Sequence, residues 1–289
     1  MQGFLSIIKP TGMSSAAVVG KVKRLLKTKK VGHMGTLDPA ASGVLTIAVG
    51  KATKFFNYFL GKDKVYYAVA EFGVMTDTLD SEGNIISRHD KVITKEDILS
   101  RINNFIGEIN QIPPIYSAIK INGRKAYELA RAGKKVEIEP RKVKIYGFNI
   151  LEELGENKFA FRIHCSAGTY IRSLLSDLSI ALGTIANIPV IIREKCGDFD
   201  IQSSVCLSDI ENFGDKALIK IEDKFAELKK IIFDEKYHKR IMNGVSIKND
   251  FKIDENQEFL GYLNNDALFG LFICQNGQIS CKINLYEGE

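Results

Sequence analysis

The chain has 289 residues, a net charge of +5, and 45% hydrophobic and 26% charged residues, which is typical of a soluble globular protein with one large and one small domain. No apolar run approaches the roughly 20 residues of a membrane span, and Pro10 breaks the N-terminus too early for a secretory signal, so we expect a cytoplasmic protein. Five cysteines without a C-x-x-C pair, four scattered histidines and the lack of a dinucleotide-binding motif predict no disulfide framework, no metal site and no cofactor.

The first predicted elements are a strand and a basic helix. Phe4 to Ile8 is predicted to form a short strand, and Ser14 or Ser15 to cap a helix that reaches about Leu26. The apolar residues of this helix share one face, and a cluster of basic residues lies on the other, namely Lys21, Lys23, Arg24, Lys27, Lys29 and Lys30. The basic helix leads directly into a glycine-rich loop.

The loop of residues 31–45 contains three glycines together with one acid, Asp38, and one imidazole, His33. Glycine permits positive φ and close backbone approach, and Pro39 biases Asp38 toward an extended conformation. The pattern predicts a rigid, exposed loop that holds a carboxylate at the start of the strand Val44–Val49. An ordinary loop with a capping Asp is the alternative, and the loop taken alone favours it.

The middle of the chain alternates helices and strands. We expect a helix over about Thr53–Leu60, a buried strand over Lys64–Phe72, and a helix that begins after the capping box at Thr94. Beyond Pro113-Pro114 the sequence predicts a strand, Ile115–Ile121, then an Asn122-Gly123 turn and a short helix that ends near Gly133.

This excursion, about residues 114–142, carries the second group of basic residues. Tyr116 and Tyr127 are interleaved with them, and basic side chains beside aromatic rings suit a phosphate backbone with splayed bases. Two solvated faces are the alternative interpretation of the two basic clusters. The basic residues of the excursion are Lys120, Arg124, Lys125, Arg131, Lys134, Lys135, Arg141 and Lys142.

The rest of the chain predicts more strands and then a change of pattern. An amphipathic helix follows Tyr170, and Ser208 to about Leu228 is loop and helix; the predicted strands are Val143–Leu151, Phe159–Cys165, Val190–Ile192 and Cys196–Phe199. From about Ile231 short β-runs are broken by glycines, which predicts a main domain over 1–230 and a small β-rich domain over 231–289. The overall class is α+β, with a mixed, mostly antiparallel central sheet flanked by helices.

The glycine-rich loop and seven other motifs resemble, in order, the pattern of bacterial TruB-type tRNA pseudouridine synthases, which modify the T-arm uridine at tRNA position 55. The resemblance covers most of residues 1–200, implies the pseudouridine synthase fold, and makes the tail look loosely like a small PUA-like RNA-binding domain. The motifs are Lys9-Pro-x-Gly-Met-Ser14, Gly32-His-Met-Gly-Thr-Leu-Asp-Pro39 with Ala41-x-Gly-Val-Leu45, Gly50-Lys-Ala-Thr-Lys54, Asp63-Lys-x-Tyr66, Gly73-x-x-Thr-Asp-Thr-x-Asp80, Gln111-Ile-Pro-Pro-x-Tyr-Ser-Ala118, Gly123-x-x-Ala-Tyr127 and Cys165-Ser-x-Gly-Thr-Tyr-Ile-Arg172.

The resemblance implies three catalytic residues. Asp38 would act at the ribose, either as a nucleophile at C1′ or as a base that opens a glycal route, and the sequence does not choose between the two. Arg172 would be the adjacent cation that favours the ionised carboxylate. Tyr66 would stack on the flipped uracil and handle the C5 proton, although a tyrosine in a strand is more often part of the core.

Further residues are implied to bind the RNA. Tyr170 and Ile191 would line the pocket, His33 would stack on a displaced nucleotide or bond a phosphate, and the basic helix would contact the tRNA backbone. In full, the expected binding residues are His33, Lys64, Asp80, Tyr170, Ile191, Lys23, Arg24 and Lys27. One departure from the family pattern is Arg193-Glu-Lys195, where a second arginine is usual.

We therefore expect an enzyme that extrudes its target base from the T-arm, binds tRNA without a protein partner, is monomeric and is able to assist tRNA folding. A guide-dependent archaeal or eukaryotic relative acting on another RNA is one alternative. A non-catalytic RNA-folding helper is the other, and the presence of Asp38, Tyr66 and Arg172 argues against it.

Overall fold

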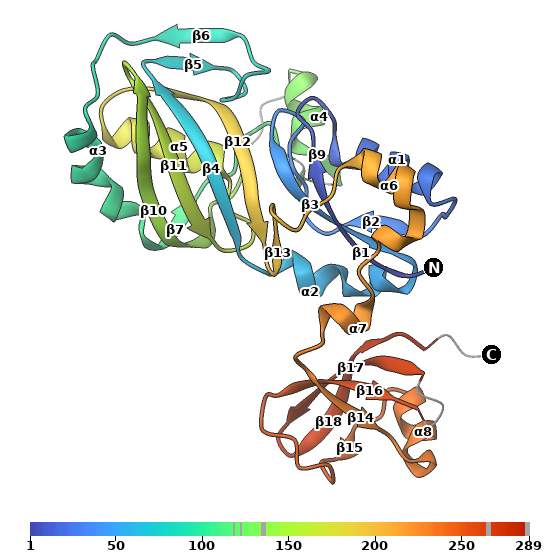
Figure 1. Cartoon of the computed structure of the whole chain (residues 1–289). Helices are drawn as coiled ribbons and strands as arrows, with labels where there is room; N and C mark the ends of the chain where they lie inside the picture. The colour runs from blue at the N-terminus through green and yellow to red at the C-terminus, as the bar shows by residue number, and fades with distance from the viewer. Residues whose placement is uncertain (118, 122, 134–136, 264–266, 287–289) are drawn as a thin grey trace.

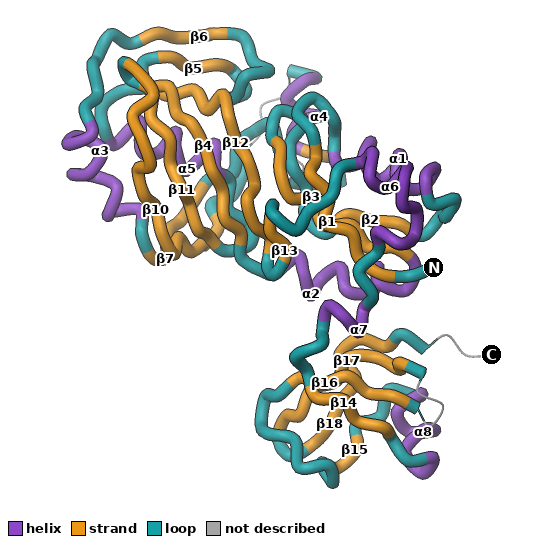
Figure 2. The backbone as a smooth tube through the Cα atoms, viewed as in Figure 1, coloured by secondary structure: helices purple, strands orange, loops and turns teal. Residues whose placement is uncertain are grey.

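The computed structural model describes residues 1–117, 119–121, 123–133, 137–263 and 267–286, and it has a large body and a smaller C-terminal body (Figures 1 and 2). The large body is built on a nine-stranded sheet with the order β1-β3-β12-β4-β11-β10-β7, to which β2 and β13 add at its side. Every pairing is antiparallel except that of β3 with β12. The predicted α+β class with a mixed, mostly antiparallel sheet is confirmed.

The sheet strands have the following bounds: β1 Gly3–Lys9, β2 Val31–His33, β3 Ser42–Val49, β4 Lys64–Phe72, β7 Gly107–Gln111, β10 Arg141–Gly155, β11 Lys158–Cys165, β12 Ala186–Cys196 and β13 Phe199–Asp200. Two short hairpins lie outside the sheet, formed by β5 Val74–Thr76 with β6 Ile85–Arg88 and by β8 Lys120–Ile121 with β9 Arg124–Lys125.

The helices of the large body form two groups, one that covers a face of the sheet and one that packs beside β2. α5 (Ile171–Ala181) packs on β4 and β12, and α3 (Lys95–Ile102), which begins at the predicted Thr94 capping box, packs on α5 and β10 (Figure 1). α1 (Ser15–Leu25), capped by Ser14 as predicted, packs on β2 and α6 (Leu207–Phe213). The remaining helical segments of the large body are η1 Gly50–Phe55, α2 Phe56–Leu60, η2 Asn103–Phe105, α4 Ala126–Arg131, η3 Gly214–Ala217 and α7 Ile221–Lys224.

Alternation along the strands separates the two faces of the sheet, because successive side chains of a strand point to opposite sides. Ala68, Ala70 and Phe72 of β4 lie in one core with Leu174 and Leu178 of α5. This core and the start of α5 fix the face on which the cavity described below is found.

One strand prediction was wrong. Of the predicted strand Ile115–Ile121, the described residues form a strand only at Lys120–Ile121, because the residues directly after Pro113-Pro114 bend instead of pairing with a neighbour. The predicted piece Val190–Ile192 lies within the longer strand β12, which keeps its pairing with β4 across register shifts on either side of Val190–Arg193. The predicted piece Cys196–Phe199 is a strand only at its ends, where Cys196 closes β12 and Phe199 begins β13. Asn122, Lys134 and Lys135, which entered the predicted turn and basic cluster, lie outside the described residues.

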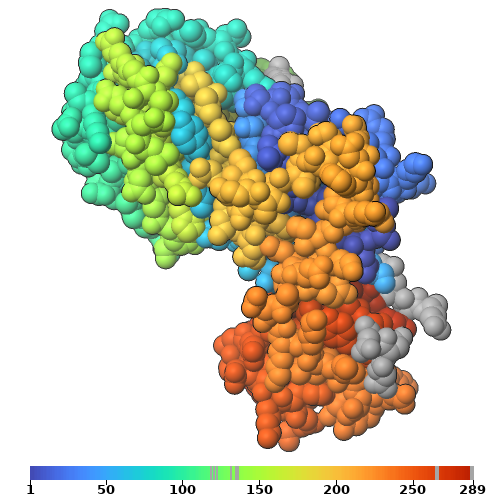
Figure 3. Space-filling view, viewed as in Figure 1, coloured from blue at the N-terminus to red at the C-terminus, as the bar shows by residue number. Residues whose placement is uncertain are grey.

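The C-terminal body is a five-stranded sheet with the order β14-β16-β17-β18-β15 and one helix, α8 (Glu235–Met242). It forms a separate lobe in Figure 3, joined to the large body beside α2. Tyr58 of α2 donates a hydrogen bond to Glu258 (3.1 Å), and Phe55 and Phe59 share a core cluster with Leu260. The strands of the C-terminal body are β14 Lys229–Ile232, β15 Ile247–Lys248, β16 Glu258–Tyr262, β17 Leu268–Gln275 and β18 Gln278–Asn284.

Within the described ranges no helix has the length and apolar character to cross a membrane.

Candidate functional site

The loop that carries Asp38 connects β2 to β3 and is held through its backbone. Ser15, at the start of α1, donates from its hydroxyl to the carbonyl of Leu37 and accepts from the Leu37 amide, both at 2.9 Å. Lys9, at the end of β1, is fully buried and donates from Nζ to the carbonyls of Met13 (2.6 Å) and Pro39 (3.2 Å). The loop therefore has a defined conformation that does not depend on the Asp38 side chain.

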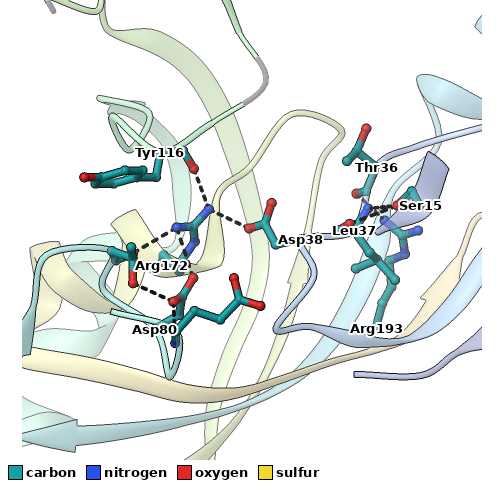
Figure 4. Close-up of polar contacts among 10 residues, drawn as sticks. Ser15, Thr36, Leu37, Asp38, Asp80, Tyr116, Arg172 and Arg193 are labelled. Carbon is teal, nitrogen blue, oxygen red and sulfur yellow. Dashed lines mark hydrogen bonds and ion pairs between the residues drawn. The ribbon is translucent and has the colours of Figure 1, made fainter. Parts of the chain in front are cut away.

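Arg193, on β12, holds the other side of the same loop. Its side chain is buried, and its guanidinium donates to three carbonyls, those of Gly35 (3.1 Å), Thr36 (3.2 Å) and Val44 (2.7 Å). Figure 4 shows Arg193 beside Thr36 and Leu37 of the loop. The sequence had drawn attention to this position only as a departure from the family pattern. The available signal was a charged residue directly after the apolar run Val190–Ile192.

The start of β3, directly after the loop, requires a glycine at position 43. It lies at the parallel pairing of β3 and β12, opposite Arg193, with φ +99°. A Cβ at this position would lie 2.3 Å from the Arg193 carbonyl oxygen, so only glycine allows the two halves of the sheet to meet.

A buried arginine binds the Asp38 carboxylate. Arg172, in the first turn of α5, donates to Asp38 Oδ2 (2.5 Å) and lies 3.3 Å from Asp80 Oδ2, so that one cation faces two carboxylates (Figure 4). It also donates to the carbonyls of Thr78 and Tyr116, both at 2.9 Å. The Arg172 and Asp80 side chains are only 4% and 8% exposed, whereas that of Asp38 is 36% exposed. Asp38 is thus the carboxylate of the network that is accessible from outside.

Asp38 and Arg172 lie at the wall of a cavity of about 760 Å³, within the size range of small-molecule sites. Tyr66 of β4 and Ile191 of β12 point into it from the helix-covered face of the sheet, and Tyr170 contributes from the turn before α5. The other lining residues are Gly35, Thr36, Leu37, Ala41, Phe56, Asn57, Leu60, Gly61, Lys64, Ile119, Arg141, Ala167, Gly168, Thr169, Ile171 and Arg193.

Burial controls the ionisation of several groups around the cavity. It raises the pKa of Tyr66 to about 12, with the nearby Arg193 charge acting in the opposite direction, so the phenol is protonated at neutral pH. Burial lowers the pKa of Lys9 to about 8, although Asp38 and Glu82 act to raise it. Burial, assisted by Arg193, also lowers the pKa of His33, which makes its imidazole neutral at pH 7.

The predicted site residues fall into two groups. Asp38, Tyr66, Arg172, Lys64, Tyr170 and Ile191 all line the cavity, and Asp80 lies directly behind Arg172. Four other residues are not part of the cavity lining. His33 is on β2, and its buried Nδ1 has no hydrogen-bond partner among the residues that the structure describes. Lys23 and Arg24 are exposed on α1, and Lys27 is exposed just after α1 ends.

Gln111 and Arg141 are residues of this site that sequence reasoning did not single out. The buried Gln111 side chain accepts from the Tyr170 amide (2.8 Å) and donates to the Tyr170 carbonyl (3.0 Å), which fixes the start of α5. The Arg141 guanidinium lies 4.4 Å from the centre of the Tyr170 ring. Gln111 begins one of the family motifs and Arg141 belongs to the second basic cluster, but both lie far along the chain from Tyr170, and no local pattern indicates that they contact it.

Chemically, the cavity combines one accessible carboxylate, a buried cation that is paired with it, and a protonated phenol between apolar walls. This set suits attack on, or proton removal from, a group held against a flat apolar ring.

Comparison with known proteins gives a consistent result. A family model described as TruB family pseudouridylate synthase (N terminal domain) matches residues 23–171. The chain is 41% identical to a protein of Clostridium kluyveri named tRNA pseudouridine synthase B, over 98% of this chain and 96% of the relative. Proteins of the same name from Clostridium perfringens and Caldanaerobacter subterraneus are 42% and 39% identical, over 94% and 98% of both chains respectively.

Two solved structures have the same fold. A chain in the structure of an H/ACA RNP bound to a substrate RNA containing 2′-deoxyuridine has a TM-score of 0.70 at 22% identity, over 99% of this chain and 85% of that one. A chain in a Cbf5-Nop10-Gar1 complex has a TM-score of 0.71 at 24% identity, over 98% and 85%.

Proposed function

The chain belongs to the TruB family of pseudouridylate synthases and is an RNA pseudouridine synthase, and from this premise we propose that it converts the T-arm uridine at position 55 of tRNA to pseudouridine. The relatives named tRNA pseudouridine synthase B support tRNA as the substrate, since they match this chain over nearly its whole length. The observation that carries the proposal is the accessible Asp38 carboxylate, held by buried Arg172 at the wall of a cavity that also contains Tyr66.

Asp38 is the proposed catalytic acid. The reaction breaks the N1–C1′ bond, rotates the uracil, joins C5 to C1′ and removes the C5 proton, without oxidation or phosphoryl transfer. An ionised carboxylate serves it either as a nucleophile at C1′ or as a base on the 2′ side. Arg172 favours the ionised form in both cases, and Asp80 orients Arg172 from behind.

Tyr66 is the proposed partner of the uracil ring. Its position beside Ile191 on the same face of the sheet supports stacking on a flipped base, with Tyr170 as a second wall. Because burial raises the pKa of Tyr66 to about 12, the phenol enters the reaction protonated. It accepts the C5 proton only as it releases its own to solvent water, so we assign it the role of a proton relay.

The target base must leave its stack, which costs roughly a few kcal/mol. We assign the contacts that offset this cost to the exposed basic residues Lys23 and Arg24 on α1 and Lys27 just beyond it, to the insertion 114–142, and to residues 231–289 as a PUA-like RNA-binding domain. A neutral His33 suits stacking on a displaced nucleotide better than ionic binding of a phosphate. Lys64 is assigned to the wall of the pocket.

We further propose that the enzyme acts in the cytoplasm as a monomer without a protein partner. It would also assist tRNA folding, since opening and releasing the T-arm uses the same contacts as catalysis. The likeness to chains from RNA–protein assemblies supports the fold and not a guide-dependent mode of action. The 39–42% identity to proteins named tRNA pseudouridine synthase B favours direct recognition of tRNA.

The test is the variant Asp38→Asn, assayed with tRNA that carries tritium at uridine C5. We expect tritium release to fall by at least about a thousandfold, because one carboxylate carries out the chemistry, while tRNA affinity changes little, because many basic groups hold the RNA. Asp215→Asn, which removes an exposed acid outside the cavity, is the matched control and should retain full activity. Full activity of Asp38→Asn, or pseudouridine mapped outside the T-arm by reverse transcription, would contradict the proposal.

A further inference from the structure

One cation at the wall of the cavity has donors that no protein group uses. Arg141 is the first residue of β10, and its guanidinium lines the same cavity as Asp38. Its Nε is buried without a hydrogen-bond partner, and across the described ranges the guanidinium makes no hydrogen bond or ion pair, only its contact with the Tyr170 ring. A buried donor without an acceptor is unfavourable, and no described protein group relieves it here.

The other cations of the cavity are occupied. Arg172 binds Asp38, Asp80 and two carbonyls, and Arg193 binds three carbonyls of the loop. Lys64 donates to the carbonyls of Leu60 and Lys62. Among the described cationic residues that line the cavity, Arg141 is therefore the one whose charged group makes no hydrogen bond or ion pair with a described residue.

The Arg141 side chain is held in a built position. Arg141 pairs with Gln111 across β10 and β7, and the Gln111 amide fixes the backbone of Tyr170, over whose ring the guanidinium lies. Gly168 completes the position, because a Cβ added there would lie 3.6–3.8 Å from the guanidinium carbon and both terminal nitrogens. The group is thus packed between an aromatic ring and a glycine, with little conformational freedom to lose on binding.

The chemistry of an RNA substrate identifies the ligand class. A fixed guanidinium edge prefers an anion with two acceptor oxygens, and the anions of RNA are its phosphodiesters. The Asp38 carboxylate would repel an anion in the same cavity, but it is paired with Arg172. The apolar walls formed by Tyr66 and Ile191 suit the base, which leaves the Arg141 side of the cavity for the backbone.

We propose that Arg141 binds a phosphodiester directly next to the flipped uridine and so fixes the nucleotide while Asp38 acts at its ribose. This inference rests on the proposed function and deepens it, since it names the part of the substrate that this cation holds. Tyr170 supports this role, since its ring contacts the guanidinium and both side chains line the same cavity.

The experiment pairs an enzyme change with a substrate change. A T-arm stem-loop RNA is prepared with a neutral methylphosphonate either 5′ or 3′ of the target uridine, and Kd and the single-turnover rate are measured for each. For the unaltered enzyme we expect one of the two substitutions to raise Kd about tenfold, the lower end for a charge-assisted hydrogen bond. Arg141→Gln should raise Kd about tenfold on the unmodified RNA and be insensitive to that same methylphosphonate.

Two further variants separate binding from structure. Lys144→Gln removes one positive charge from the opposite face of the same strand, and it should keep the full methylphosphonate effect. Arg141→Lys should restore part of the affinity and of the methylphosphonate effect, which a purely structural role would not do. The proposal is overturned if Arg141→Gln remains as sensitive as the unaltered enzyme, or if neither methylphosphonate affects the unaltered enzyme. Failure of the unaltered enzyme to modify unsubstituted RNA would overturn the proposed function instead.

Discussion

Replacing Arg172 with Met would show which of its two carboxylates it serves for stability. The Asp80 side chain is 8% exposed, so without Arg172 it becomes an uncompensated buried charge, which costs about 3–5 kcal/mol of unfolding free energy. The Asp38 side chain is 36% exposed, and the partly solvated pair contributes about 1 kcal/mol or less. We therefore expect Arg172→Met to lower the unfolding free energy by at least about 3 kcal/mol, mainly through Asp80.

The assay is a double-mutant cycle measured by urea unfolding. In an Asp80→Asn background the cost of Arg172→Met should fall by about 3 kcal/mol, because the buried charge is gone. Oδ1 of residue 80, which accepts from Thr78 and Glu82, is retained in the Asn side chain. In an Asp38→Asn background the cost should change by less than about 1 kcal/mol. A larger coupling with Asp38 than with Asp80 would refute the reasoning, and the Arg172→Met, Asp80→Asn enzyme should fold yet be inactive.

Two other changes test separate parts of the structure. Burial raises the pKa of Asp177 to about 6 from 3.8, so the folded state binds a proton that the unfolded state releases, and stability falls as pH rises through this window. Asp177→Asn should remove this slope in urea unfolding and raise the unfolding free energy at pH 7 by about 1 kcal/mol, because the half-buried side chain is partly screened by solvent, whereas Asp90→Asn, at an exposed acid, should not. A non-glycine residue at positive φ costs about 1–3 kcal/mol of backbone strain. Gly43→Ala should lower the unfolding free energy by more than this, because its Cβ would also clash with the neighbouring strand. Gly12→Ala, at φ +82° with no atom within 4 Å, measures the strain alone, and equal losses would contradict the clash.

Much of the site could be predicted from the sequence because its parts lie in local motifs. Asp38 lies in a glycine-rich loop, Tyr66 at the start of a strand rich in β-formers, and Tyr170 and Arg172 at a turn that starts a helix. Each motif has a recognisable local pattern, and their common order matched one family. The structure brings these four residues to one cavity.

The supporting residues could not be predicted in the same way. Lys9, Arg193, Gln111 and Arg141 lie on four different strands, and their roles depend on which strands pair and on which carbonyl or ring each one meets. Strand periodicity assigns a side chain to a face but does not indicate that a cation on that face is buried. Pro189 likewise concealed the continuity of β12, because proline interrupts a strand pattern unless a register shift accommodates it.

The way the loop is held makes the Asp38→Asn experiment a test of chemistry. Ser15, Lys9 and Arg193 all bind backbone atoms of the loop, whereas the Asp38 side chain is bound by Arg172. An Asn side chain has nearly the same shape and keeps an acceptor oxygen for Arg172, so the loop and the cavity should retain their geometry. The expected loss of unfolding free energy is therefore about 1 kcal/mol or less, as for a partly exposed ion pair. A large loss of activity at this small structural cost would locate the chemistry at the carboxylate, since the backbone contacts alone determine where the loop lies.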